Sequence, residues 1–166
     1  MSTLPRSIYA THFPGPACPV SLRQVDERVV RVTAVLTAAL LPTAILGPPA
    51  AAIFLALAAD FAARAAGLPR YSPLAWIARG LVSVGARAGW LAARPRPVDA
   101  APKRFAAACG LLFALAIALA LVLGAPRALT GAVLAMFAAC ALLEGLLGYC
   151  VGCAVYAGLP PRLRGV

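Results

Sequence analysis

Long apolar stretches constrain this sequence more than any other feature. They run from Val29 to Leu46, from Ala50 to about Ala66, from Phe105 to about Leu123 and from Ala128 to about Tyr156. Each approaches the roughly 20 apolar residues that a helix needs to cross a bilayer. Hydrophobic residues make up 63% of the 166 and charged residues only 12%, whereas about a quarter of a soluble domain is charged. The pattern excludes a soluble enzyme, a disordered chain and a coiled coil, and it predicts an all-α membrane protein.

Glycine and proline separate the apolar stretches. Turns are expected at Gly47-Pro48-Pro49, at 67–69 and at 124–127, because proline cannot continue a preceding helix. We therefore predict four transmembrane helices arranged as two hairpins in a single domain, residues 25–158. A Pro-rich lead, 1–24, precedes this domain, and a short tail, 159–166, follows it.

Residues 71–93, between the two hairpins, have a different pattern. Arg79 and Arg87 lie about two helical turns apart and share a face, and Trp76 and Trp90 lie near the ends of the segment. This pattern is typical of an amphipathic helix in the membrane interface. A fifth span is the alternative, although each arginine near a helix centre costs roughly 2.5–3.5 kcal/mol on insertion. A re-entrant segment is also open.

The basic residues are distributed unequally between the two predicted sides of the membrane. Of the 15 lysines and arginines, 14 lie in the lead, the segment between the hairpins and the tail, and only Arg127 lies on the other side. By the positive-inside rule both termini are cytoplasmic, as expected in a bacterial inner membrane. Topology and contact with the lipid bilayer account for the net charge of +10, so we expect no nucleic-acid partner.

The cysteines carry the strongest hint of function. Cys18, Cys109, Cys150 and Cys153 are predicted near the cytoplasmic side, and Cys140 lies near the middle of the fourth span. A permanent disulfide is disfavoured in that reducing compartment. Cys150 and Cys153 form a C-x-x-C, and residues three apart on a helix share a face. They are therefore candidate catalytic residues of thiol chemistry, although cysteine is also an ordinary small packing residue in membrane helices.

The position of the pair presents a difficulty for thiol chemistry. As the last turn of a long fourth span, Cys150 and Cys153 would lie at a helix C-terminus, where the dipole disfavours a thiolate. Arg104 or the arginines of the tail would have to offset that effect. Cys18 precedes Pro19 and would cap a helix N-terminus, which makes it a candidate nucleophile or merely a loop thiol.

A metal site is a further alternative. Cys18, Cys150 and Cys153 with either His12 or Cys109 would provide four ligands for zinc or iron. A second C-x-x-C, which would make this reading strong, is absent from the sequence, and His12 is the only histidine. The preferred reading therefore includes neither a metal nor another cofactor.

Charged residues inside the spans are candidate supporting residues. Asp60 and Arg64, four apart, are placed for a salt bridge on one helix face. Glu144 is an intramembrane carboxylate, which is a functional-site hypothesis by default. It would accept protons for the thiols, pair with an arginine or simply hold helices together.

Several short motifs resemble a family of small bacterial integral membrane proteins that is common in actinobacteria and classed as a domain of unknown function. They are Asp60-Phe61-x-x-Arg64, Arg70-Tyr71-Ser72-Pro73, Pro102-Lys103-Arg104-Phe105-Ala106 and Gly148-Tyr149-Cys150-Val151-Gly152-Cys153. The resemblance implies that Arg104, Phe105, Cys150, Gly152 and Cys153 are family positions. It also implies an association with thioredoxin-like and sulfurtransferase-like proteins. Many relatives have an acidic residue where this chain has Ala154, and not all share Cys18, which weakens a role for Cys18.

Taken together, the sequence predicts a membrane thiol-redox or sulfur-relay protein that uses Cys150 and Cys153. Its expected partner is a cytosolic thioredoxin-like protein or sulfurtransferase. The alternatives are a non-enzymatic structural or transport-associated subunit, and the metal site. No Ser-His-Asp set, phosphate loop or pair of catalytic carboxylates is recognisable. The Ala-rich helices would also suit a homo-oligomer.

Overall fold

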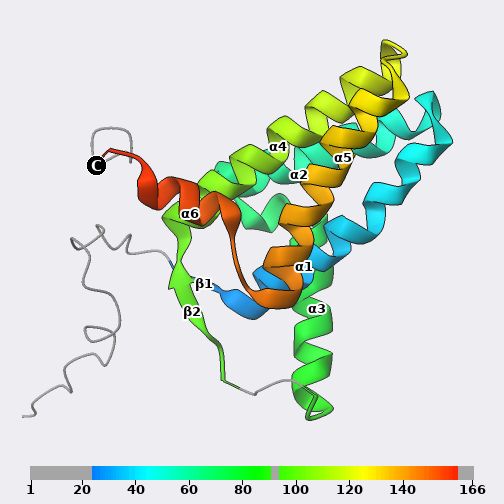
Figure 1. Cartoon of the computed structure of the whole chain (residues 1–166). Helices are drawn as coiled ribbons and strands as arrows, with labels where there is room; N and C mark the ends of the chain where they lie inside the picture. Colours follow the sequence, from blue (N-terminus) through cyan, green and yellow to red (C-terminus); the bar gives the residue numbers. More distant parts are fainter. Residues whose placement is uncertain (1–23, 91–93, 161–166) are drawn as a thin grey trace, which may run out of the picture.

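A computed structural model describes residues 24–90 and 94–160 of the chain, apart from the Ile45 side chain. The expectations for the lead, for His12 and Cys18, and for most of the tail fall outside these residues. Helices dominate the described part, as the sequence predicts: α1 is Glu27–Leu40, α2 Ala51–Ala65, α3 Pro73–Arg87, α4 Ala100–Val122, α5 Arg127–Leu142 and α6 Val151–Gly158. Figure 1 shows α2, α4 and α5 side by side, with α3 extending away from them.

Two short strands, which the sequence analysis did not anticipate, start the two helical halves. β1 (Gln24–Asp26) pairs antiparallel with β2 (Pro97–Asp99), with Val25 opposite Val98. The last residue of each strand caps the helix that follows. The Asp26 carboxylate accepts from the Arg28 amide at 3.0 Å, and the Asp99 carboxylate accepts from the Ala101 amide at 3.1 Å. An aspartate at this position satisfies backbone donors that a helix start leaves unpaired.

Among the described residues, three helical segments are long and apolar enough to cross a membrane. They are Pro48–Ala65, Ala100–Val122 and Arg127–Leu147. Their outward faces expose apolar side chains, including Leu112, Leu119, Leu129 and Leu146. These are the helices of a membrane protein, because lipid takes the place of water against such faces.

The predicted first span does not form one uniform α-helix. α1 passes into a 3-10 helix, η2 (Leu41–Leu46), at a proline that lacks an amide donor. Within α1 the buried hydroxyls of Thr33 and Thr37 donate to carbonyls one turn earlier, at 2.7 and 3.0 Å. Gly47 (φ 71°) and a short 3-10 turn, η3 (Pro48–Ala50), then lead into α2.

A small aromatic and aliphatic core joins α2, α4 and α5. Phe54, Phe61, Ile117 and Phe137 are nearly inaccessible. The Phe137 ring stacks on Phe113 with centroids 5.3 Å apart and lies 5.7 Å from Phe61. This core packs the three helices against one another, and the site lies toward the start of α4 and the end of α5.

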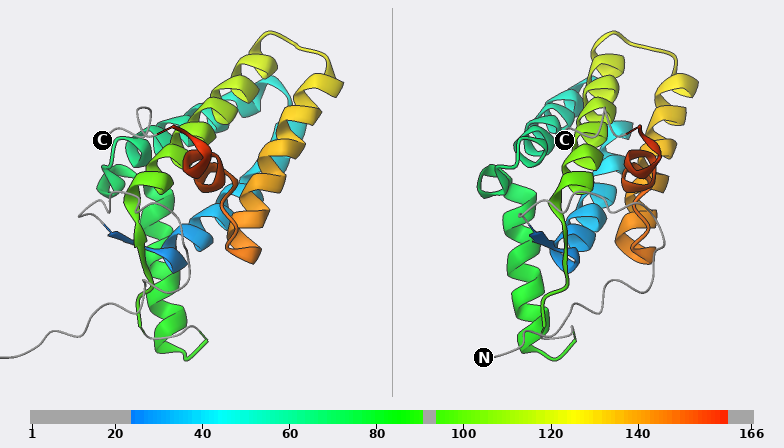
Figure 2. Two further views of the ribbon diagram at one scale, coloured as in Figure 1. Left: turned by 60° about the vertical axis from the view of Figure 1, so that its left-hand side comes forward. Right: turned by 90° about the vertical axis from the view of Figure 1, so that its left-hand side faces the viewer.

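The segment predicted to lie in the membrane interface forms α3, with the 3-10 turn η4 (Pro69–Tyr71) before it. Its buried stripe consists of small residues and one valine: Ala75, Ala78, Val82 and Gly85. Trp76, Ile77, Leu81 and Val84 are exposed on another side. Figure 2 shows that α3 extends past the end of the bundle that lies opposite the α4–α5 turn.

Candidate functional site

The helix predicted for the fourth span, 128–156, ends before the cysteines, and a separate helix begins at them. α5 passes into a π-helical turn, η5 (Leu143–Leu147), and Gly148 has a left-handed backbone with φ 72°. This conformation strains every residue except glycine, which explains Gly148 in the terminal motif. The chain then starts a new helix, α6, which runs off at a different angle (Figure 1).

The C-x-x-C therefore lies at a helix N-terminus, and the expectation of a helix C-terminus was wrong. Cys150 is the N-cap of α6, and its Sγ accepts a hydrogen bond from the Cys153 amide at 3.3 Å. The positive end of the helix dipole and the unpaired amides of a first turn favour a thiolate. The difficulty that the sequence posed for thiol chemistry is thus removed by the break at Gly148.

The absence of a side chain at Gly152 allows α6 to pack closely against α4. A Cβ added at Gly152 would lie 2.7 Å from the Ala106 Cβ and 2.8 Å from its Cα. One turn further along, the rings of Phe105 and Tyr156 lie 5.6 Å apart. The two motifs noted in the sequence at 102–106 and 148–153 therefore lie close together in the fold, since α4 carries the first and α6 begins within the second.

A lysine and a glutamate form an ion pair next to the cysteines. Lys103 Nζ on α4 lies 2.7 Å from Glu144 Oε1 on η5, and these side chains are only 16% and 18% exposed. Both charges act on Cys150 and Cys153. The partner of Glu144 is thus a lysine, whereas the sequence suggested an arginine.

Cys150 and Cys153 have different surroundings, which shift their pKa values in opposite directions. The pKa of Cys153 lies below its ordinary value, chiefly because the Cys150 thiol donates a hydrogen bond to its sulfur and also because Lys103 is near. The pKa of Cys150 is raised by this same hydrogen bond, by burial and by the charge of Glu144. Cys150 is 9% exposed, whereas Cys153 is only partly buried. The accessible member of the pair is therefore also the one that ionises more readily.

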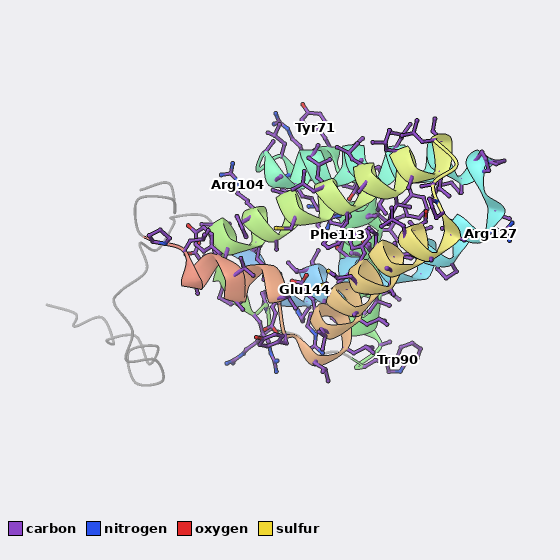
Figure 3. All side chains as sticks on the ribbon, turned by 45° about the horizontal axis from the view of Figure 1, so that its top comes forward. Tyr71, Trp90, Arg104, Phe113, Arg127 and Glu144 are labelled. Carbon is purple, nitrogen blue, oxygen red and sulfur yellow. The ribbon has the colours of Figure 1, made fainter. Side chains whose placement is uncertain are left out.

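The Arg104 side chain binds the end of α2 and does not lie beside the thiols. Its Nε donates to the Ala65 carbonyl at the end of α2, at 2.9 Å. Figure 3 shows Arg104 and Glu144 on opposite sides of α4. Adjacent residues on a helix point about 100° apart, so only one of Lys103 and Arg104 can face α6. The motif was recognised in the sequence, but the charge near the cysteines was assigned to the wrong member.

Arg31, which the sequence analysis did not single out as a site residue, closes the end of the broken span. Its guanidinium donates to the carbonyls of Gly145 at 3.2 Å and Leu146 at 2.6 Å. These carbonyls belong to the π-helical turn, where regular helix bonding ends. Arg31 therefore stabilises the backbone that leads into the cysteine pair.

Asp60 and Arg64 form the predicted ion pair, at 2.8 Å. The Asp60 carboxylate also accepts from the Ser72 hydroxyl at 2.7 Å and the Leu74 amide at 3.0 Å. Ser72 in turn caps α3 through the Ala75 amide. Asp60 thus joins the end of α2 to the start of α3, which is a structural role for a buried charge.

A cavity of about 1,010 Å³ lies between α1, α4 and α5 and reaches the site. Cys150, Lys103, Glu144 and Arg64 line it at the end where α6 begins. Cys109 and Cys140 also line it, and the two are close enough to interact electrostatically. Cys140, which the sequence set apart near the middle of its span, therefore shares a cavity with Cys109 and Cys150. No pattern of spacing could have shown this, because α4 and α5 meet only in the fold.

The cysteines of the described part, Cys109, Cys140, Cys150 and Cys153, are free thiols. In residues 24–90 and 94–160, no three His, Cys, Asp or Glu side chains gather closely enough to hold a metal ion. Cys18 and His12, which the metal hypothesis invoked, lie outside these residues.

Comparison with known proteins identifies a family of unknown function. Neither a curated protein nor a solved structure matches this chain. A family model described as "Domain of unknown function (DUF4395)" matches residues 25–159, a range that contains the six α-helices, the cysteine pair and both short strands except Gln24. The chain belongs to this DUF4395 family of unknown function.

Proposed function

We propose that the protein is a membrane dithiol–disulfide exchange protein whose reactive pair is Cys150 and Cys153. One observation carries the proposal: the pair starts a helix, Cys150 as its cap and Cys153 three residues on, beside the Lys103 ammonium. Helix N-termini and neighbouring cations are the features that activate cysteine in proteins. Cysteines that only fill space in the core would require neither a helix N-terminus nor a neighbouring cation.

The exchange follows from the acidity and exposure of the two thiols. The Cys153 thiolate attacks a disulfide of the partner protein, which forms a mixed disulfide and releases one partner thiolate. Cys150 then loses its proton and attacks the Cys153 sulfur, which releases the second partner thiolate. The protons of Cys150 and Cys153 end on the two partner thiols, and two electrons move to the partner. The reverse sequence reduces the Cys150–Cys153 disulfide.

The partner is a cytosolic thioredoxin-like protein or a sulfurtransferase. The greater exposure and acidity of Cys153 support this residue as the thiol that would meet such a partner. In the sulfur-relay form, the Cys153 thiolate would attack the outer sulfur of a persulfide on the partner. The sulfur–sulfur bond of that persulfide would break, which leaves a persulfide on Cys153 and releases the partner's thiolate.

The topology we propose has four crossings in two hairpins, α3 as an interfacial helix, and both termini in the cytoplasm of a bacterial cell. Two observations support the fourth crossing. β1 pairs with β2, so α1 begins at the same end as α4, while η3 contacts α4 near the far end of the bundle. The segment 27–46 therefore covers the same distance as α4. The distribution of basic residues supports the orientation.

Trapping of thiols in the purified full-length protein in mild detergent tests the function. After oxidation by a soluble disulfide and quenching with acid, alkylation and mass spectrometry should locate a reversible Cys150–Cys153 disulfide. A persulfide on either residue would indicate the sulfur-relay form. Cys150→Ser and Cys153→Ser should each abolish the intramolecular disulfide, and Cys109→Ser is the matched control that should leave it intact. Slow, redox-insensitive alkylation of both cysteines would refute the proposal.

A further inference from the structure

The cavity next to Cys150 is amphipathic along its length. Phe113, Met136 and Phe137, in the middle of α4 and α5, line its inner part. Lys103, Glu144 and Arg64 line the end at which Cys150 is exposed to the same space. A volume of about 1,010 Å³ is at the upper end of the range that small-molecule sites occupy.

Arg64 lines the polar end of the cavity. Its Nη2 pairs with Asp60, but its Nε is buried and has no hydrogen-bond partner in the part of the chain that the structure describes. Buried donors are nearly always satisfied in folded proteins. The Nε itself is closed off from the cavity, so a ligand would approach the exposed part of the Arg64 side chain, which is 19% exposed.

The two thiols of the pair face different surroundings, one the cavity and the other the surface of the protein. Cys150 lines the cavity, whereas Cys153 is not among the lining residues and is the more exposed thiol. A pair that exchanges with a soluble partner through Cys153 can therefore meet a different reactant through Cys150. That reactant is selected by apolar walls in a membrane-spanning bundle and by polar donors near the sulfur.

We propose that the cavity binds a lipophilic quinone, which takes two electrons from the Cys150–Cys153 dithiol. The inference deepens the proposed function and rests on it. The ring would lie at the polar end, with an oxygen toward the basic side chains of Arg64 and Lys103, and the apolar tail would occupy the space between α1, α4 and α5. The apolar inner part around Phe113 and Phe137 would disfavour a charged ligand there. The polar part of the cavity is lined by basic side chains, those of Arg64, Arg70, Arg79, Lys103 and Arg104.

The step balances without any further reactant. The Cys150 sulfur bonds to a ring carbon of the quinone, and its proton passes to the ring. The Cys153 thiolate then attacks the Cys150 sulfur, so the carbon–sulfur bond breaks and the disulfide forms. The electron pair of the broken bond stays on the ring, which takes up a second proton, the one that Cys153 lost on ionisation. The dithiol is oxidised to the disulfide, and the quinone is reduced to the hydroquinone.

The test uses the reduced full-length protein in mild detergent with decylubiquinone or a short-chain menaquinone. Hydroquinone formation is followed by absorbance and the Cys150–Cys153 disulfide by alkylation. Cys140→Phe places a ring in the cavity without touching the reactive pair, and Cys140→Ser is the matched control without added volume. We expect Cys140→Phe to slow oxidation by the quinone by about tenfold or more because the site is filled. Oxidation by a soluble disulfide should be unchanged in both variants and shows that they are folded.

The outcomes separate the two proposals. Oxidation of the wild type and Cys140→Ser by quinone, with loss only in Cys140→Phe, supports the quinone site. Equal oxidation of all three proteins, or of none of them while the soluble disulfide still reacts, overturns the quinone site and leaves the exchange function standing. If neither oxidant forms the disulfide, the exchange function itself fails. A tightly held phospholipid in the purified protein, not displaced by quinone, would also overturn the inference.

Discussion

At the scale of single residues, the site depends on an asymmetry between two cysteines that look equivalent in sequence. Cys150 is buried and caps a helix by accepting from the Cys153 amide, whereas Cys153 is more accessible and lies near Lys103. The sequence placed both on one helix face and gave no reason to distinguish them. Their difference arises from contacts with α4 and η5, which are remote in sequence.

This asymmetry predicts which thiol reacts first and how its reactivity depends on pH. Because the pKa of Cys153 is lowered, its thiolate persists as pH falls below the ordinary thiol pKa of about 8.5. Cys153 should therefore be alkylated by iodoacetamide several-fold faster than Cys150 near pH 7, with a pH midpoint below that of an unperturbed thiol. Peptide mass spectrometry over a pH series measures both rates.

Lys103 supplies the control for that experiment. Lys103→Gln removes a charge that lowers the Cys153 pKa, so the pH midpoint of Cys153 alkylation should move upward. Lys103→Arg keeps the charge and should leave the midpoint nearer to that of the wild type. Equal alkylation of both cysteines at every pH would show that the two thiols are not distinguished as the structure indicates.

At the scale of elements, the contact between α4 and α6 positions the pair. Gly152→Ala would bring a methyl group to 2.7 Å from the Ala106 Cβ and 2.8 Å from its Cα, so one helix must move. Overpacking of this kind costs about 1–3 kcal/mol. We expect a lower melting temperature and faster alkylation of Cys150, both measured on the purified protein.

Gly158→Ala is the matched control on the same helix. An added Cβ there meets nothing within 4 Å, so the free energy of unfolding should change by no more than about 0.5 kcal/mol. An equal effect of the two substitutions would argue that helix propensity, and not the contact with α4, sets the position of α6.

The elements also show what the sequence could and could not predict. Hydropathy predicted α2 closely, and it predicted α4 except for its first turn, which depends on the Asp99 cap. The Asp60–Arg64 pair followed from spacing alone, because both lie on one helix. The break at Gly148 was missed because apolar residues continue on both sides of it, and only the three glycines at 145, 148 and 152 signal it. The β1–β2 ladder and the Lys103–Glu144 pair join distant segments, which no local pattern reveals.

At the scale of the whole molecule, the proposed topology predicts which residues are reached from each side of the membrane. We expect Ala125→Cys, in the turn between α4 and α5, to react with a membrane-impermeant maleimide in intact cells. Gln24→Cys and Arg70→Cys, at the other end of the bundle, should react only after lysis. Mass tagging on gels measures each reaction in a background without native cysteines.

The three positions test the crossings independently. If Gln24→Cys reacts in intact cells and Arg70→Cys does not, an odd number of crossings separates them and the segment 27–46 does not span. If Ala125→Cys reacts only after lysis, the orientation that the basic residues indicate is reversed. Normal expression of each variant shows that the labelling reports on the folded protein.

The ladder of β1 and β2 has a further consequence for the architecture, because its central pair, Val25 and Val98, marks a local pseudo-twofold axis. Asp26 caps α1 and Asp99 caps α4. Five residues after each aspartate is an arginine that donates to backbone carbonyls of the other half. Arg31 donates to the turn that ends α5, and Arg104 donates to the last residue of α2. Gly67 and Gly148, both with positive φ, follow those ends. Ser72 and Cys150 then cap the next helices through amides three residues on. The two halves are thus one structural unit used twice, and the reactive pair occupies the junction that the first half uses only to hold α3.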